Sequence, residues 1–144
     1  NKYTADKEAF DSWITNVRTI AKEYGYEKAV SLSLGTFLSH SPNGEDGIFP
    51  HEIIRDFFEE NAYESYVSEY LIPNFVVGKS NHEGAKVFWG SSSNHEKHMA
   101  EKYNNDAKII KIDYPETSSI LKRLSDSYEW SSKAVSSIDE RYFD

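Results

Sequence analysis

The chain has 144 residues, a formal charge of −8 at pH 7 and no cysteine, and aromatic side chains make up 15% of it. Without cysteine there is no disulfide scaffold, no thiol nucleophile and no thiolate zinc site. The acidic charge disfavours binding to nucleic acid or to an anionic membrane, because their phosphate groups repel it. It is typical of a soluble protein, expected in the cytoplasm, and suits docking on a basic protein partner.

The length predicts one globular domain over residues 1–144, with the last few residues frayed. No apolar run reaches the roughly 18–20 residues that a bilayer-spanning helix needs. No signal-peptide pattern opens the chain. We expect no cofactor, no bound metal and no contact with a membrane.

The first predicted element is an amphipathic helix over residues 4–24. Its apolar side chains recur every three or four residues, and Gly25 suits the left-handed residue that ends a helix. Such a stripe is either core or partner surface, and its period favours core. The stripe consists of Phe10, Trp13, Ile14, Val17, Ala21 and Tyr24.

The next segment, residues 29–34, is predicted to form a strand. Apolar Val30, Leu32 and Leu34 alternate with serines, and a period of two is typical of a strand with one buried face. A helix that continues through Leu38 fits the same residues, and the alternation does not separate the two.

A loop is predicted over residues 40–49, because Ser-Pro, Asn-Gly and Asp-Gly turn signals follow one another there. Pro50 suits the first position of a helix. From Pro50 to Leu71 the apolar pattern fits two short helices that meet near Asn61, or one long helix, ending before Pro73.

The second half of the chain predicts a hairpin followed by a strand–helix–strand unit. Residues 75–79 and 85–89 flank a short loop, as in a β-hairpin. A helix over 93–104 leads to a strand over 107–113, and a right-handed crossover makes two strands parallel. Beyond Pro115 another helical stripe begins. We therefore predict an α+β fold: a mixed sheet of about four strands, with one hairpin, one βαβ unit and helices packed mainly on one face.

The junction between the strand and the helix of this unit is the first candidate site, for an anion. Gly90, Ser91, Ser92 and Ser93 would place hydroxyl groups and free backbone N–H groups at a helix N-terminus, where phosphate or carboxylate binds. Lys97, one turn further along, adds a positive charge. The alternative is structural: Ser93 caps the helix and Gly90 relieves the turn.

Residues 87–92, with the sequence VFWGSS, resemble the first strand and turn of the lysine-decarboxylase-like phosphoribohydrolases. That family has a second glycine-rich phosphate loop with a catalytic glutamate, which has no counterpart in this chain. The turn matches neither the GxGxxG nor the GxxxxGK[ST] pattern. From its sequence we therefore assign the chain to no family.

Two histidines follow the turn. His95 and His98 are three residues apart on the predicted helix, so their rings can share one face. Zinc accepts imidazole ligands, and the pair would be half a site. The spacing differs from HExxH, however, and Lys97 between them disfavours a cation. In the anion site the two histidines are candidate acids, bases or anion donors.

No complete catalytic set accompanies these residues. No pair stands out among the 24 acidic residues as an acid and base, and there is no GxSxG turn for a serine nucleophile. The outline of helix, helix and hairpin over residues 50–90 resembles a winged-helix module. However, residues 50–71 carry six acidic side chains against Arg55 alone, and this charge opposes binding to DNA.

The acidic, tyrosine-rich part of that segment is the second candidate site, for a protein partner. Tyrosine is enriched at interfaces, and carboxylates beside it would pair with Arg or Lys of a basic partner. The alternative is that the tyrosines bury their rings and leave their hydroxyl groups at the surface. The candidate residues are Asp56, Glu59, Glu60, Tyr63, Tyr66 and Tyr70.

Two functions follow from these sites. The first is a small acidic protein that acts by protein–protein interaction, as an inhibitor, immunity or adaptor protein, without its own catalysis. The second is an enzyme or sensor that binds a phosphorylated or carboxylated small molecule at the turn over residues 90–93. Because no catalytic set is complete, the sequence favours the first.

Overall fold

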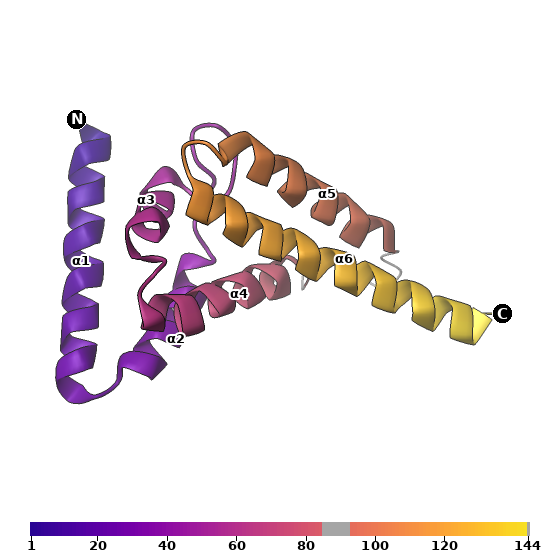
Figure 1. Cartoon of the computed structure of the whole chain (residues 1–144), viewed down its shortest axis with the longest axis horizontal. Coiled ribbons are helices and arrows are strands. Elements are labelled where there is room, and N and C mark those ends of the chain that lie inside the picture. The colour runs from indigo at the N-terminus through magenta and orange to yellow at the C-terminus, as the bar shows by residue number, and fades with distance from the viewer. Residues whose placement is uncertain (85–92, 144) are drawn as a thin grey trace. The chain divides into compact units, whose positions relative to one another are not determined.

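The chain is helical in the part that the structure describes (Figure 1). The computed structural model describes residues 1–84 and 93–143, and for residues 84, 93 and 135–143 it describes the backbone alone. Within these ranges there is no strand, so the predicted α+β fold with its mixed sheet is wrong. The contacts divide the chain into two compact units, Asn1–Phe75 and Val76–Asp144. The single domain stays a prediction, because a contact unit need not fold alone.

The first predicted strand, residues 29–34, belongs to α2 (Glu27–Leu38). The buried side chains of α2 recur at helical spacing, and they are Ser31, Leu34, Gly35 and Leu38. The alternation was misleading because it assigned Ser31 to the solvent side, whereas Ser31 is a core residue with 4% of its surface exposed. The helical alternative was therefore the correct one.

The second predicted strand, residues 75–79, lies inside α4 (Ile72–Gly84). The predicted hairpin is therefore wrong at its first strand. Pro73 lies inside a continuous helical run, because η1 (Val67–Leu71) leads directly into α4 and the Ile72 N–H donates to the backbone oxygen of Val67, so Pro73 does not mark a helix end. The preference of Phe and Val for strands is weak, and packing overrides it here.

The last predicted strand, residues 107–113, is also wrong, because α5 (Ser93–Ile110) continues to Ile110 and a turn follows. The isoleucines of this segment predict a strand by composition. However, the buried residues Ala107 and Ile110 are three positions apart, which is the spacing of one side of a helix. The strand predicted over 85–89 lies outside the described residues. No βαβ unit is present among the residues that are described.

The first unit contains α1 (Lys2–Tyr24), α2, α3 (Glu52–Asn61) and a π-helix, η1 (Val67–Leu71), and it ends at the start of α4. α1 confirms the first predicted helix. It ends at Gly25, whose φ of 77° is the left-handed geometry that favours glycine. Figure 1 shows α1 beside α3, and α2 after the turn at residue 25. α3 ends near the predicted boundary at Asn61.

α2 packs closely against η1 at a glycine. A Cβ atom on Gly35 would collide with the backbone oxygen of Leu71 and would lie 3.0 Å from the backbone nitrogen of Phe75. Beside it, Asn74 Nδ2 donates to the backbone oxygen of Leu32 at 2.6 Å and to Thr36 Oγ1 at 2.7 Å. α2 therefore meets η1 and the start of α4 backbone to backbone, and the Asn74 side chain joins α4 to α2.

The second unit contains the rest of α4, α5 and α6 (Pro115–Phe143). α5 and α6 form an antiparallel hairpin, which is held by serines that a propensity scale disfavours in helices. Ser118 Oγ donates to the backbone oxygen of Ala107 at 2.7 Å, and Ser125 Oγ donates to that of Ala100 at 2.6 Å. These serines thus connect the helices rather than weakening α6.

A buried tyrosine pair joins α4 to this hairpin. The rings of Tyr103 and Tyr128 stack at 5.9 Å, and Tyr103 Oη donates to Glu83 Oε1 at 2.5 Å. Burial raises the pKa of Tyr103 well above its usual range, and the nearby Glu83 carboxylate raises it further. Tyr103 is therefore neutral and donates its proton to the hydrogen bond with the end of α4.

Candidate functional site

The apolar stripe of α1 is divided between the core and the surface. Ile14 and Ala21, seven residues apart, are buried in the first unit. Trp13, Ile20 and Tyr24 lie on the neighbouring side of the helix and are exposed. The prediction that the stripe is core is therefore right for one side and wrong for the other, because a stripe this wide exceeds what one neighbouring helix covers.

α2 extends this exposed apolar surface. Phe37 lies on α2 beside Trp13, with 5.3 Å between the ring centroids. Near the turn, Tyr26 is exposed and Val30 is half-buried. We call the combined surface the α1–α2 face, and it consists of Phe10, Trp13, Val17, Ile20, Tyr24, Tyr26, Val30 and Phe37.

Two hollows lie in the α1–α2 face. The first has about 370 Å³ and is lined by Phe10 and Phe37 together with residues of the following loop and α3, with Asp6, His40 and His51 as its polar groups. The second has about 320 Å³ and is lined only by the apolar side chains of Val17, Ile20, Ala21, Tyr24, Tyr26 and Val30. Their residues on α1 are separated by about twelve positions, or roughly 18 Å at the rise of a helix.

The area of the α1–α2 face is large for an exposed apolar surface. The exposed fractions are 39% for Trp13, 55% for Ile20, 67% for Tyr24, 65% for Tyr26 and 61% for Phe37. At roughly 200 Å² for each full side chain, they leave on the order of 500–600 Å² of apolar surface in contact with solvent. This is at the upper end of the roughly 300–600 Å² of the largest apolar patch on a typical monomer, a patch that is often functional.

Charge is unevenly distributed between the two units. Residues 1–75 carry thirteen acidic and six basic side chains, which gives −7, whereas residues 76–144 carry eleven and ten, which gives −1. The first unit, which contains the α1–α2 face, therefore holds nearly all of the negative charge. A basic partner would be attracted to this unit in particular.

The acidic residues predicted to bind a partner are largely occupied by the chain's own first helix. Tyr3 Oη donates to Asp56 Oδ2 at 2.8 Å, Lys7 Nζ lies 3.5 Å from Glu60 Oε1, and Arg18 pairs with Glu64. A hydrogen bond to Asp11 raises the pKa of Lys7, and the charges of Glu60 and Asp56 add to the effect. Glu59 is half-buried on the same helix. Side chains of α1 thus already make part of the contacts that these carboxylates were expected to make with a basic partner.

The three predicted interface tyrosines have different surroundings. Tyr63 is 82% exposed. Tyr66 and Tyr70 are half-buried, with their ring centroids 5.8 Å apart, and Lys28 Nζ lies 5.3 Å from the Tyr70 centroid. Tyr66 also lines a polar hollow together with Thr15, Arg18 and Glu64. No single apolar surface therefore unites these three rings.

The predicted anion site lies mostly outside the described residues, which exclude Gly90, Ser91 and Ser92 and describe Ser93 by its backbone alone. Ser93 is the first residue of α5, and the position before it lies outside the described residues, so the capping alternative stays a prediction. His95 is half-buried, and Lys97 and His98 are exposed. Lys97 lines a shallow hollow together with Lys122 and Glu129. Binding of an anion at this turn stays a prediction.

The described part of the chain shows neither a metal site nor a membrane-spanning helix. Over residues 1–84 and 93–143, no group of three or more His, Asp or Glu side chains is placed to hold a metal ion. None of the described helices carries a stretch that is both long and apolar enough to cross a lipid bilayer. The described residues therefore offer neither a metal site nor a membrane span beside the two hollows of the α1–α2 face.

One wall of the first hollow is the loop between α2 and α3, which a buried arginine holds in place. Arg55, with 1% of its side chain exposed, donates to both carboxylate oxygens of Asp46 at 2.9 and 2.8 Å. It also donates to the backbone oxygens of Ile48 and Pro50, at 2.6 Å each. The hydrogen bond from Arg55 lowers the pKa of Asp46, which stays ionised. The guanidinium group has five N–H donors in a planar fork, so it can bind a carboxylate and two backbone oxygens at once.

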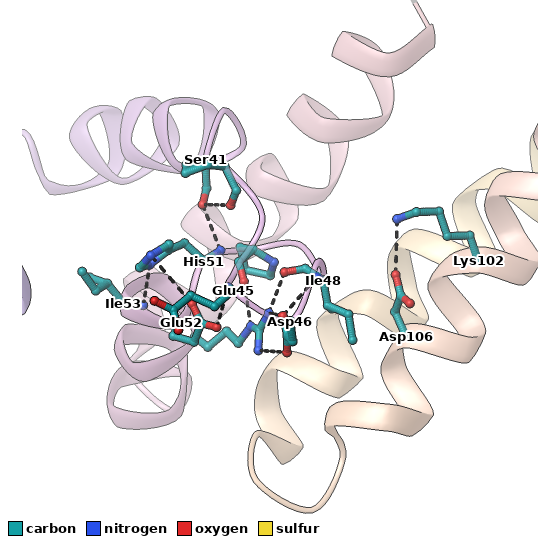
Figure 2. A network of polar contacts seen from close by, with 12 residues as sticks. Ser41, Glu45, Asp46, Ile48, His51, Glu52, Ile53, Lys102 and Asp106 are labelled. Atoms are coloured by element: carbon teal, nitrogen blue, oxygen red, sulfur yellow. Dashed lines mark hydrogen bonds and ion pairs between the residues drawn. The ribbon is translucent and has the colours of Figure 1, made fainter. Parts of the chain in front are cut away.

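Further contacts within the same loop add to this frame (Figure 2). The backbone nitrogen of Glu45 donates to Glu52 Oε1 at 2.9 Å, and that of His51 donates to Ser41 Oγ at 3.1 Å. His51 Nδ1 accepts from the backbone nitrogen of Ile53 at 3.2 Å and so caps α3. The wall of the first hollow is therefore built into the fold.

The sequence analysis predicted neither the buried Arg55 that holds the loop nor the exposed ring of Phe37 on the α1–α2 face. It used Arg55 only as the lone positive charge in an acidic segment. A single arginine in an acidic and aromatic helix, shortly after an Asp-Gly turn, was a signal for a buried ion pair. The exposure of Phe37 had no signal in the sequence, because it depends on what lies beside α1 and α2.

Comparison with protein-family models, with curated proteins and with solved structures gives no match. The function is therefore argued from the geometry and the charge of this chain alone.

Proposed function

We propose that the protein acts by protein–protein interaction and that its partner docks on the α1–α2 face. The observation that supports the proposal is a set of exposed apolar side chains, with two hollows, on the acidic unit of the chain. None of the eight side chains of the face is charged. Aromatic side chains in a water-excluding surface contribute most of the binding energy in protein interfaces.

The docking surface differs from the one expected from the sequence. The acidic side of α3 already contacts α1, whereas the rings of the α1–α2 face are exposed and no other element of the first unit covers them. Acidic residues elsewhere on the unit then attract a basic partner from a distance, and the apolar face holds it.

A substitution tests whether Phe37 belongs to the surface. Phe37→Lys is expected to change the free energy of unfolding by less than about 1 kcal/mol, because 61% of the side chain is already in water. Phe58→Ala, at a side chain with no exposed surface, is expected to cost about 3–5 kcal/mol. Urea unfolding followed by tryptophan fluorescence measures both. A loss at Phe37 as large as that at Phe58 would mean that the face is core.

Docking itself is tested by photo-cross-linking in the cells that produce the protein. A benzophenone amino acid at Ser33, which is exposed between Val30 and Phe37 on α2, is expected to form one discrete adduct with one protein. The same amino acid at Thr15, which is exposed on the polar side of α1, serves as the control and is expected to form none. The Ser33 adduct should disappear when Phe37→Lys is added. Equal adducts at both positions, or none at Ser33, would refute the proposal.

A further inference from the structure

We infer that the occupant of the α1–α2 face is a single amphipathic helix of a partner protein, with basic side chains along its flanks. This rests on the proposed docking function and names the partner's chemistry. The hollows are the first evidence. They are roughly 18 Å apart along α1, and a helix that rises 1.5 Å per residue covers that distance in about 11–14 residues.

Residues 11 or 14 positions apart lie on the same side of a helix, so one straight helix presents two large side chains to both hollows at once. An extended strand would cover the same distance in about five or six residues, with its intermediate side chains alternating between the face and the solvent. The α1–α2 face has no strand edge among its residues to pair with such a segment. The spacing therefore favours a helix.

The middle of the face restricts the size of the side chains. Trp13 lies on α1 between the residues of the two hollows, and its ring contacts Phe37. We expect the docking helix to place a small side chain over this ring pair. The expected pattern is large, small, large along one side of the helix.

The negative charge of the first unit favours basic side chains along the flanks of the docking helix. The first unit carries −7, and the exposed acidic residues on the side of α1 that bears the face or next to it are Asp6 and Glu23, against Lys2 as the exposed basic residue there. Lysine or arginine along the docking helix would therefore be favoured, and acidic flanks would be repelled. The same charge opposes a second copy of this chain, because two units of −7 would be brought together.

The probe is a synthetic helical peptide of about 18 residues, with Trp and Leu eleven positions apart, alanine between them on the same side and lysine on the flanks. Its binding to the full chain is measured by fluorescence anisotropy up to about 200 µM protein. One control peptide has glutamate in place of lysine. A second has the same composition, with its two large side chains on opposite sides of the helix. Both controls are expected to bind at least tenfold more weakly than the probe.

Protein variants locate the peptide. Phe37→Lys and Ile20→Lys are each expected to weaken binding at least tenfold, whereas Thr15→Lys, with the same change of charge, is expected to leave it within about twofold. Equal binding of the probe and of the control whose large side chains lie on opposite sides would mean that the peptide binds by its charge alone. That result would overturn the inference. Failure of the probe to bind up to about 200 µM would overturn it as well.

Two results separate this inference from the proposed function. If the probe fails and the cross-linked adduct at Ser33 remains, the occupant is a partner of another shape and docking stands. If sedimentation equilibrium gives a dimer that Phe37→Lys dissociates, the occupant is a second copy and the inference is overturned. If the probe fails and the adduct at Ser33 is absent too, both the inference and the proposed docking on the α1–α2 face are overturned.

Discussion

Replacing Arg55 with methionine is expected to lower the free energy of unfolding by about 3–4 kcal/mol. The side chain is buried and donates to Asp46 and to the backbone oxygens of Ile48 and Pro50. Methionine fills a similar volume without donors, so that the buried oxygen of Pro50 loses its donor, at about 1–3 kcal/mol. The oxygen of Ile48 loses one of two hydrogen bonds, at about 0.5–1.5 kcal/mol, because it also accepts from the Gly44 N–H. The carboxylate of Asp46 adds less, because 41% of that side chain is exposed and water can replace the guanidinium.

Urea unfolding at neutral pH measures this loss, with Arg18→Met as the matched control. Arg18 pairs with Glu64 on the surface, and its loss is expected to cost less than about 1 kcal/mol. If Arg55→Met were no more destabilising than Arg18→Met, the loop would not depend on the buried arginine. The wall of the first hollow would then need another explanation.

Replacing Gly35 with alanine is expected to lower the free energy of unfolding by about 2–3 kcal/mol. The added methyl group would collide with the backbone oxygen of Leu71, and backbone atoms cannot turn aside as a flexible side chain can. The direction of the effect is diagnostic. In an exposed part of a helix the same substitution stabilises by about 0.5–1 kcal/mol, because alanine is the better helix former.

Ser33→Ala, two residues earlier on the solvent side of α2, is the control for helix propensity and is expected to be neutral or slightly stabilising. The same urea experiment compares the two variants. A gain in stability for Gly35→Ala, similar to that for Ser33→Ala, would show that α2 and η1 are not in backbone contact at Leu71.

The sequence was sufficient to predict α1, its end at Gly25, the loop near residues 40–49 and the helix beyond Pro115. These elements have long periodic patterns or specific end signals. The strands were wrong where short apolar runs fit both periods. In α2 the buried Ser31 was taken for a solvent-facing position of a strand. In α4 the residues Phe75 and Val76 suggested a strand by composition.

The candidate site was harder to predict for a physical reason. An apolar stripe on a helix indicates that one side avoids water, but it does not state how much of that side a neighbour covers. Ile14 and Trp13 are adjacent in sequence and belong to the same predicted stripe, yet one is buried and the other is exposed. That difference arises from the packing of α1 on α2 and α3, which a single sequence does not specify.

The account depends most on the claim that the α1–α2 face is where a partner binds. The most direct measurement is the ratio of cross-linked adduct from Ser33 to that from Thr15, in the otherwise unchanged protein and in Phe37→Lys. We predict a ratio of at least about ten in the unchanged protein and a ratio near one in the variant. A ratio near one in both proteins would contradict the claim.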